Sequence, residues 1–189
     1  DAAPDSEGPD DPTAGDDEPL STVTRRPPPV DAGETIYEEL DSHKVVFVVD
    51  LSGSMRVRCQ DEAGISRSRM DYVKEQLMGA IASELEDGAR FNVIGFSTGI
   101  TPWKKKLVKA TDKTRKKARS WIHKVMQPNG ETNIYGALRT AFKHKDVDTI
   151  YFLTDGYPTA GEETVNDTIL GKVRAWNVSR RVRIHTIAF

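Results

Sequence analysis

The stretch VVFVVDLSGS, residues 45–54, joins a continuous apolar run to a short polar loop that begins at Asp50. A continuous apolar run predicts a strand buried on both faces, as in parallel sheets covered by helices. Residues 149–154 (TIYFLT) repeat the pattern, and Asp155 follows them. The sequence therefore predicts two buried strands, each ending in an aspartate.

Strand and helix patterns alternate along residues 43–189. Further strands are predicted at residues 91–97 and 183–189, with a lysine-rich edge strand at residues 103–108. Apolar residues at spacings of three and four predict four helices. Their predicted buried faces are Met70, Val73, Leu77, Ile81 and Leu85; Ala118, Trp121, Ile122 and Val125; Ile134, Leu138 and Ala141; and Val165, Ile169, Val173 and Trp176. This alternation predicts an α/β class fold: a Rossmann-like, doubly wound, mostly parallel sheet with one antiparallel edge strand and helices on both faces.

The first part of the chain has a different composition from this predicted domain. Residues 1–42 contain 13 Asp/Glu and 2 Arg, whereas residues 43–189 contain 16 Asp/Glu and 25 Lys/Arg. Residues 1–42 are rich in Asp, Pro and Gly, so we expect a disordered acidic linker that is locally extended at residues 24–29 (TRRPPP). The chain stops within or just after a predicted strand that would normally be covered by a helix. We therefore expect a truncated C-terminus, and further domains beyond one or both ends.

The composition sets broad limits. A hydrophobic content of 37% and a charged content of 30% predict a soluble globular domain. No run of about 18 apolar residues occurs, so we expect no membrane span in this chain. The single cysteine, Cys59, cannot form an internal disulfide. It leaves the compartment open, with a secreted or cell-envelope location as the working expectation.

Oxygen-bearing side chains follow both predicted central strands. Ligands bind at the carboxyl ends of the strands in a doubly wound sheet, so Asp50 and Asp155 would share a crevice if their strands are neighbours. Residues 50, 52 and 54 can turn their oxygens toward one point, and Gly53 permits the necessary curl of the backbone. Two carboxylates and several hydroxyls suit Mg²⁺, Mn²⁺ or Ca²⁺ rather than zinc. The sequence predicts a site for a hard divalent cation.

These motifs resemble the metal-ion-dependent adhesion site of von Willebrand factor type A domains. DLSGS at 50–54, the threonine in NGETN at 129–133 and TDG at 154–156 carry the resemblance, which extends over residues 43–189. It implies that Ser52, Ser54 and Thr132 coordinate Mg²⁺ directly through their hydroxyls. Asp50 and Asp155 would coordinate it directly or through water, and the sixth ligand would be solvent or the carboxylate of a protein partner.

The function implied by this resemblance is that of a metal-dependent protein-binding module that captures an Asp or Glu of its partner. The segment 56–69 is longer than the family pattern leads us to expect, so it is expected to shape or cover the binding face. The alternative is a purely structural role, in which the two aspartates cap loops and the Ser and Thr residues occupy turns.

Enzymatic readings are less well supported, and we expect no catalytic activity. Residues 95–99 match the G-x-S-x-G motif, which needs a helix immediately after the serine, here Ser97. Asp155 and His185 would have to complete a triad. An aspartyl-phosphate mechanism at Asp50 usually has a second aspartate two residues on, where this chain has Ser52.

A second binding hypothesis rests on a basic segment. Residues 101–125 hold ten Lys/Arg and one acidic residue, Asp112, which favours a polyanion-binding module as the alternative. Only Trp103 and Trp121 offer aromatic rings nearby, so nucleic acid is the less favoured polyanion. The same surface could steer acidic partners toward the metal. The possible steering patch consists of Lys104, Lys105, Lys106, Lys109, Lys113, Lys116 and Lys117.

Overall fold

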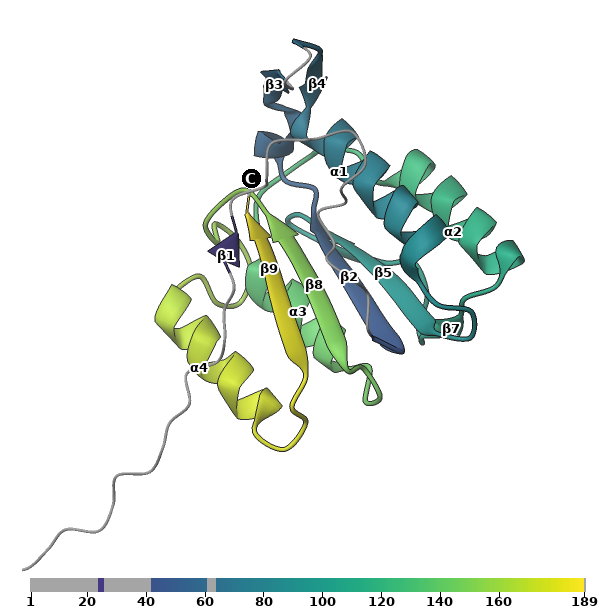
Figure 1. Cartoon of the computed structure of the whole chain (residues 1–189). Helices are drawn as coiled ribbons and strands as arrows, with labels where there is room; N and C mark the ends of the chain where they lie inside the picture. Colours follow the sequence, from purple (N-terminus) through teal and green to yellow (C-terminus); the bar gives the residue numbers. More distant parts are fainter. Residues whose placement is uncertain (1–23, 26–41, 61–63, 189) are drawn as a thin grey trace, which may run out of the picture.

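A central sheet covered by helices forms the core of the computed structural model, which describes residues 24–25, 42–60 and 64–188 (Figure 1). Within the described residues the sheet has seven strands in the order β1-β9-β8-β2-β5-β6, with β7 also pairing with β5. The strands are β1 (Thr24–Arg25), β2 (Lys44–Asp50), β5 (Arg90–Phe96), β6 (Ile100–Pro102), β7 (Val108–Lys109), β8 (Thr149–Thr154) and β9 (Arg183–Ala188). The α/β class and the mostly parallel sheet are confirmed, because only β6 and β7 run antiparallel to β5.

Strand β2 is the centre of the sheet. It pairs in parallel with β5, the next parallel strand along the chain, on one side and with β8 on the other. The winding direction of the sheet therefore reverses at β2, which is where ligands bind in folds of this kind. The register sets Val49 opposite Leu153, so β2 and β8 end level with each other. Asp50 and Thr154 are consequently neighbours.

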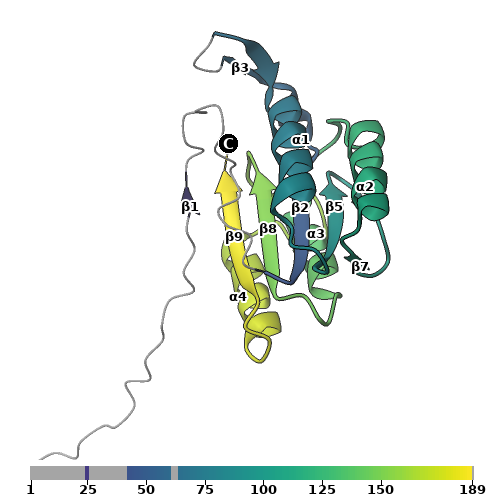
Figure 2. The same ribbon diagram turned by 45° about the vertical axis from the view of Figure 1, so that its right-hand side comes forward.

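Helices cover both faces of the sheet, as predicted (Figure 1; Figure 2). Alternate residues of β2 point to opposite faces: Phe47 lies in one apolar cluster and Val48 in the other. The first cluster contains buried apolar residues of α1, η2 and α2, and the second contains buried apolar residues of α3 and α4. The helical segments are α1 (Arg69–Gly79), the π-helical turn η2 (Ala80–Glu84), α2 (Asp112–Val125), α3 (Ile134–Phe142) and α4 (Asn166–Asn177). None of the described helices is both long and apolar enough to cross a membrane.

The edge strand predicted at residues 103–108 is wrong as a continuous element. β6 ends at Pro102 and β7 begins at Val108. Between them, the side-chain amide of Asn92 donates to the carbonyl of Lys104 at 2.8 Å and accepts from its amide N–H at 3.1 Å. This buried side chain takes the hydrogen-bond partners that a neighbouring strand would use, and the lysines at 104–106 are exposed. Val165 also departs from its predicted buried position, since it precedes α4 and is 57% exposed.

One region extends the sheet beyond the sequence prediction. Thr24 and Arg25, assigned above to the linker, pair in parallel with Thr186 and Ile187 of β9. The remainder of the predicted linker before residue 42 lies outside the described residues. Ser42 is buried, and its hydroxyl lies 2.7 Å from that of Thr149.

Arg115 of α2 stabilises the end of η2. Its buried guanidinium donates to the carbonyls of Ile81 and Leu85 at 2.5 and 2.6 Å, and to Asp87 at 3.2 Å. These carbonyls lie at the end of a helix, where the last carbonyl groups have no N–H partner within the helix. The guanidinium therefore joins two neighbouring helices on one face of the sheet.

Replacing Arg115 with Met should lower the free energy of unfolding by about 2–4 kcal/mol, because it leaves buried carbonyls without donors. Urea unfolding followed by circular dichroism would measure the change. Lys116→Met, at an exposed neighbouring position, should alter stability by less than about 0.5 kcal/mol. Equal effects of the two substitutions would contradict this role for Arg115.

Candidate metal-binding site

Asp50 anchors the candidate site at the end of β2. Its side chain is completely buried, and both carboxylate oxygens accept hydrogen bonds. Oδ1 accepts from the backbone N–H of Ser52 at 2.7 Å, and Oδ2 accepts from the hydroxyl of Thr154 at 2.7 Å. The carboxylate is thus fixed between the loop that follows β2 and the last residue of β8.

The environment of Asp50 is unfavourable to a negative charge. Burial raises the pKa of its carboxyl group above the ordinary value. The hydrogen bonds from Thr154 and Ser52 lower this pKa, and the nearby Asp155 carboxylate raises it. A divalent cation at this edge of the sheet would stabilise the ionised carboxylate.

The other predicted ligands of the Asp50 loop form a hydrogen-bonded chain. The hydroxyls of Ser52 and Ser54 lie 2.9 Å apart, and Ser54 donates to Oδ1 of Asp155 at 2.8 Å. The short 3₁₀ helix η1 (Gly53–Arg56) provides the backbone curl that the sequence predicts after Ser52. Asp50, Ser52, Ser54 and Asp155 are therefore joined into one cluster of oxygen atoms.

Thr132 lies on a loop that docks against this cluster. The backbone N–H of Gly53 donates to the carbonyl of Gly130 at 2.9 Å, and that of Asn129 donates to the carbonyl of Leu51 at 2.6 Å. Thr132 is 5% exposed, and its N–H donates to the hydroxyl of Thr159 at 2.9 Å. Its hydrogen bonds with described residues all use the backbone. The structure brings the Thr132 loop to the site, and its hydroxyl is not a member of the hydrogen-bonded chain.

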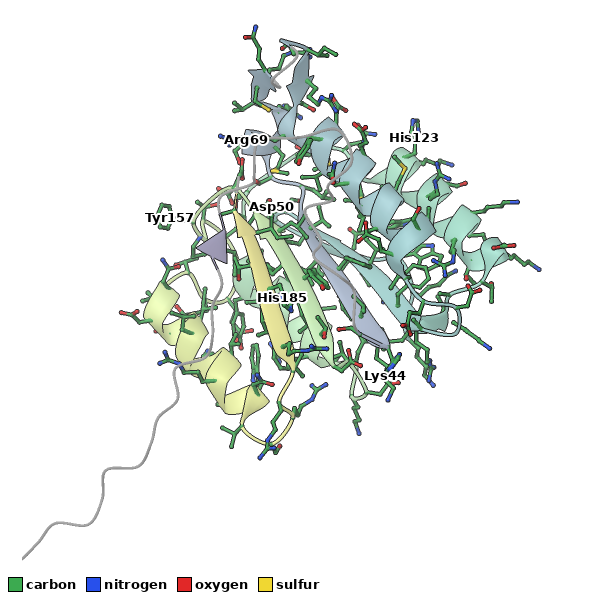
Figure 3. The ribbon with its side chains drawn as sticks, in the orientation of Figure 1. Lys44, Asp50, Arg69, His123, Tyr157 and His185 are labelled. Atoms are coloured by element: carbon green, nitrogen blue, oxygen red, sulfur yellow. The ribbon has the colours of Figure 1, made fainter. Side chains whose placement is uncertain are left out.

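Arg69 is a charged group of the site that the sequence analysis did not single out. Its Nη1 donates to Oδ2 of Asp155 at 2.8 Å, and the side chains are 29% and 0% exposed. Figure 3 shows Arg69 and Tyr157 at the same end of the sheet as Asp50, with Lys44 at the opposite end. The only sequence signal was the unusual length of the segment 56–69, whose last residue is Arg69.

That long segment forms a hairpin beside the site. Strands β3 (Arg58–Gln60) and β4 (Ser66–Ser68) pair antiparallel, and the hairpin stands beyond the end of the sheet (Figure 2). Val57 and Ile65 on this segment are 49% and 58% exposed, and Tyr157 is 78% exposed. The edge of the sheet that carries the oxygen cluster is thus bordered by exposed apolar side chains, which is common at protein-binding surfaces.

The lysines of the possible steering patch lie elsewhere. All seven are exposed: Lys104, Lys105 and Lys106 between β6 and β7, Lys109 in β7, and Lys113, Lys116 and Lys117 on α2. β7 pairs with the first residues of β5, so this part of the patch lies at the opposite end of that strand from the oxygen cluster. This part of the patch and the candidate metal site are separate surfaces that can be altered independently.

The donor set fits a hard cation. Among the described residues, no group of three or more His, Cys, Asp or Glu side chains gathers in a metal-binding arrangement. The cluster contains two carboxylates, and its other donors are hydroxyls. Such donors favour Mg²⁺, Mn²⁺ or Ca²⁺ and disfavour zinc. Fold and site together define a doubly wound α/β domain with an oxygen cluster at the point where its winding reverses.

The comparisons with known proteins identify the family. A von Willebrand factor type A domain model matches residues 43–189. The chain is 28% identical over 159 residues to human von Willebrand factor A domain-containing protein 3B, covering 84% of this chain and 11% of that protein. It is 32% identical over 146 residues to the human protein 3A, covering 77% and 11%. The chain belongs to the von Willebrand factor type A domain family, and it spans about a tenth of the length of these relatives.

Solved structures share the fold. A von Willebrand factor type A protein from Catenulispora acidiphila superposes with a TM-score of 0.59 at 22% identity, covering 78% of this chain and 32% of that one. The manganese-loaded TRAP protein of Plasmodium vivax gives a TM-score of 0.52 at 20% identity, covering 78% and 57%. At these identities the likeness confirms the fold alone.

Replacing Gly130 with Ala should displace the Thr132 loop. Gly130 has a φ of 76°, and an added Cβ would lie 2.6 Å from the hydroxyl oxygen of Thr98. We expect a loss of about 1–3 kcal/mol in the free energy of unfolding. Gly99→Ala is the control, because no atom lies within 4 Å of its added Cβ. Thermal unfolding of both variants tests the prediction, and an unaffected Gly130→Ala protein would contradict it.

Proposed function

We propose that this domain is a Mg²⁺-dependent protein-binding module that captures an acidic side chain of its partner. The observation that carries the proposal is the continuous hydrogen-bonded cluster of Asp50, Ser52, Ser54 and Asp155 at the carboxyl end of the central strands. Burial raises the pKa of the Asp50 carboxyl group, and a cation bound beside it would lower that pKa.

Asp50, Ser52, Ser54, Thr132 and Asp155 would hold the ion, which when bound supplies a centre that attracts a carboxylate oxygen. Hydroxyls are weak donors and two carboxylates do no more than balance a divalent charge. An ion held by these residues would therefore keep affinity for one further anionic oxygen. The manganese-loaded state of the similarly folded Plasmodium vivax TRAP protein makes Mn²⁺ a suitable probe beside Mg²⁺.

We propose binding rather than catalysis. The segment that matches the nucleophile motif is a tight turn between β5 and β6, in which the N–H of Ser97 donates to the carbonyl of Gly99 at 2.9 Å. Strand β6 follows this turn at once, where the motif requires a helix. His185 lies within β9, where its ring stacks on that of Tyr151 with the ring centroids 4.8 Å apart.

Asp50→Asn should abolish stabilisation of the domain by Mg²⁺ or Mn²⁺ while preserving the fold, because it removes one ligand charge and keeps the shape. An ion present at a hundred times its Kd should raise the unfolding free energy of the wild type by about 2.7 kcal/mol. Calorimetric titration and thermal unfolding would measure both effects.

The matched control is Asp146→Asn, which removes an aspartate paired with Arg90 near the start of β8, at the other end of the sheet. This variant should bind the ion as the wild type does. Unchanged metal affinity in Asp50→Asn would refute the assigned site. No uptake of either ion by the wild type would end the proposal as a whole.

Polyglutamate offers a defined acidic probe that separates the metal hypothesis from the polyanion alternative. Binding of polyglutamate at the metal should be lost in EDTA and restored by Mg²⁺.

The change of Lys104, Lys105 and Lys106 to Glu should slow association with polyglutamate about tenfold at low salt if the patch steers acidic partners. Stopped-flow kinetics would measure the rate, with Lys143→Glu combined with Lys145→Glu as the control at exposed positions following α3.

Binding that persists in EDTA, falls steeply with salt and is lost in the triple variant would favour the polyanion alternative. Binding that needs Mg²⁺ and is unaffected by the triple variant would support capture at the metal and reject steering.

A further inference from the structure

The ion pair between Arg69 and Asp155 is part of the fold. Arg69 is the first residue of α1, and Ser68 caps the helix through reciprocal hydrogen bonds with Asp71. The backbone N–H of Arg69 donates to the carbonyl of Val57 at 3.0 Å, closing the base of the hairpin. The position of the guanidinium is therefore fixed by the start of a helix and by its contact with Asp155.

The Arg69–Asp155 pair is largely shielded from solvent, so the charge of each group acts strongly on its neighbours. Ion pairs at the surface are weakened by solvent and salt, but the Asp155 side chain is fully buried and that of Arg69 is 29% exposed. A buried carboxylate needs a partner of opposite charge, and Arg69 provides it. The guanidinium has five N–H donors. Among the described residues, Asp155 is the only acceptor that this guanidinium contacts.

Arg69 changes the charge balance at the oxygen cluster. Two ionised carboxylates alone would neutralise a divalent ion and leave a site with no net charge. With the guanidinium included, the empty site has one net negative charge and the loaded site has one net positive charge. A nearby positive charge repels the metal ion and attracts an anionic ligand.

We propose that Arg69 is a built-in cation of this site that couples the binding of the metal to the binding of the partner's carboxylate. It lowers the affinity of the empty site for the ion and raises the affinity of the loaded site for an anion. The N–H groups that Asp155 does not use can donate to the incoming carboxylate. This inference rests on the proposed metal-dependent function and concerns its regulation.

Arg69→Gln should bind Mn²⁺ roughly tenfold more tightly than the wild type in chloride, the effect of one charge at close range. Saturating acetate, compared with chloride at equal ionic strength, should tighten Mn²⁺ binding to the wild type. In Arg69→Gln this gain should fall by about the same factor. The electron paramagnetic resonance signal of free Mn²⁺ measures both affinities directly.

Two further variants separate charge from structural support. Arg69→Lys keeps the charge and should bind Mn²⁺ nearly as the wild type does. Arg67→Gln removes a neighbouring guanidinium that pairs with Glu75 at 2.6 Å, and it should leave both affinities unchanged. Thermal unfolding of each variant without metal identifies any loss of the fold.

The outcomes distinguish the two proposals. If the wild type takes up no Mn²⁺, the proposed function fails and this inference fails with it. If the wild type binds Mn²⁺ and folded Arg69→Gln binds it equally or more weakly, only the role of Arg69 is overturned. The role is also overturned if Arg69→Lys behaves as Arg69→Gln does, or if acetate has the same effect on the wild type and Arg69→Gln.

Discussion

The hydrogen bond from the Thr154 hydroxyl to the Asp50 carboxylate joins the two strand ends on which the site depends. It exists because β2 and β8 pair in parallel and end level with each other. The apolar interior fixes that register, since a shift by one residue would turn the buried side chains toward the wrong face. Core packing thereby sets the separation of the charged groups at the edge of the sheet.

Hydrogen bonds between the two loops that meet at the site hold the cluster in place. Backbone hydrogen bonds link Leu51 to Asn129 and Gly53 to Gly130, so the two loops that meet at the site support each other. Burial disfavours the ionised form of Asp50, and the hydrogen bonds from Thr154 and Ser52 oppose that effect. Buried ionisable groups with shifted pKa values are typical of functional sites.

Much of the fold could be predicted from apolar periodicity, and the pairing of Asp50 with Asp155 from the rule for strand ends. Thr132 depended on the family resemblance, because its loop reaches the site only through tertiary contacts. The sequence could not show that Asn92 would interrupt the edge strand, since a side chain bonding to a backbone leaves no periodic signal. Arg69 was missed for a related reason: its partner lies 86 residues away, and no local pattern marks a long-range ion pair.

The β3–β4 hairpin is attached to the body of the domain at a narrow base, where the backbones of Val57 and Arg69 are hydrogen bonded. Residues 58–60 and 64–66 of the hairpin are exposed and belong to neither apolar cluster, so its sequence and length can change at little cost to the fold. The hairpin can therefore vary in sequence, or be replaced by another loop, while the oxygen cluster stays intact. Related domains could share the same oxygen cluster and still differ in the partner that their hairpins select.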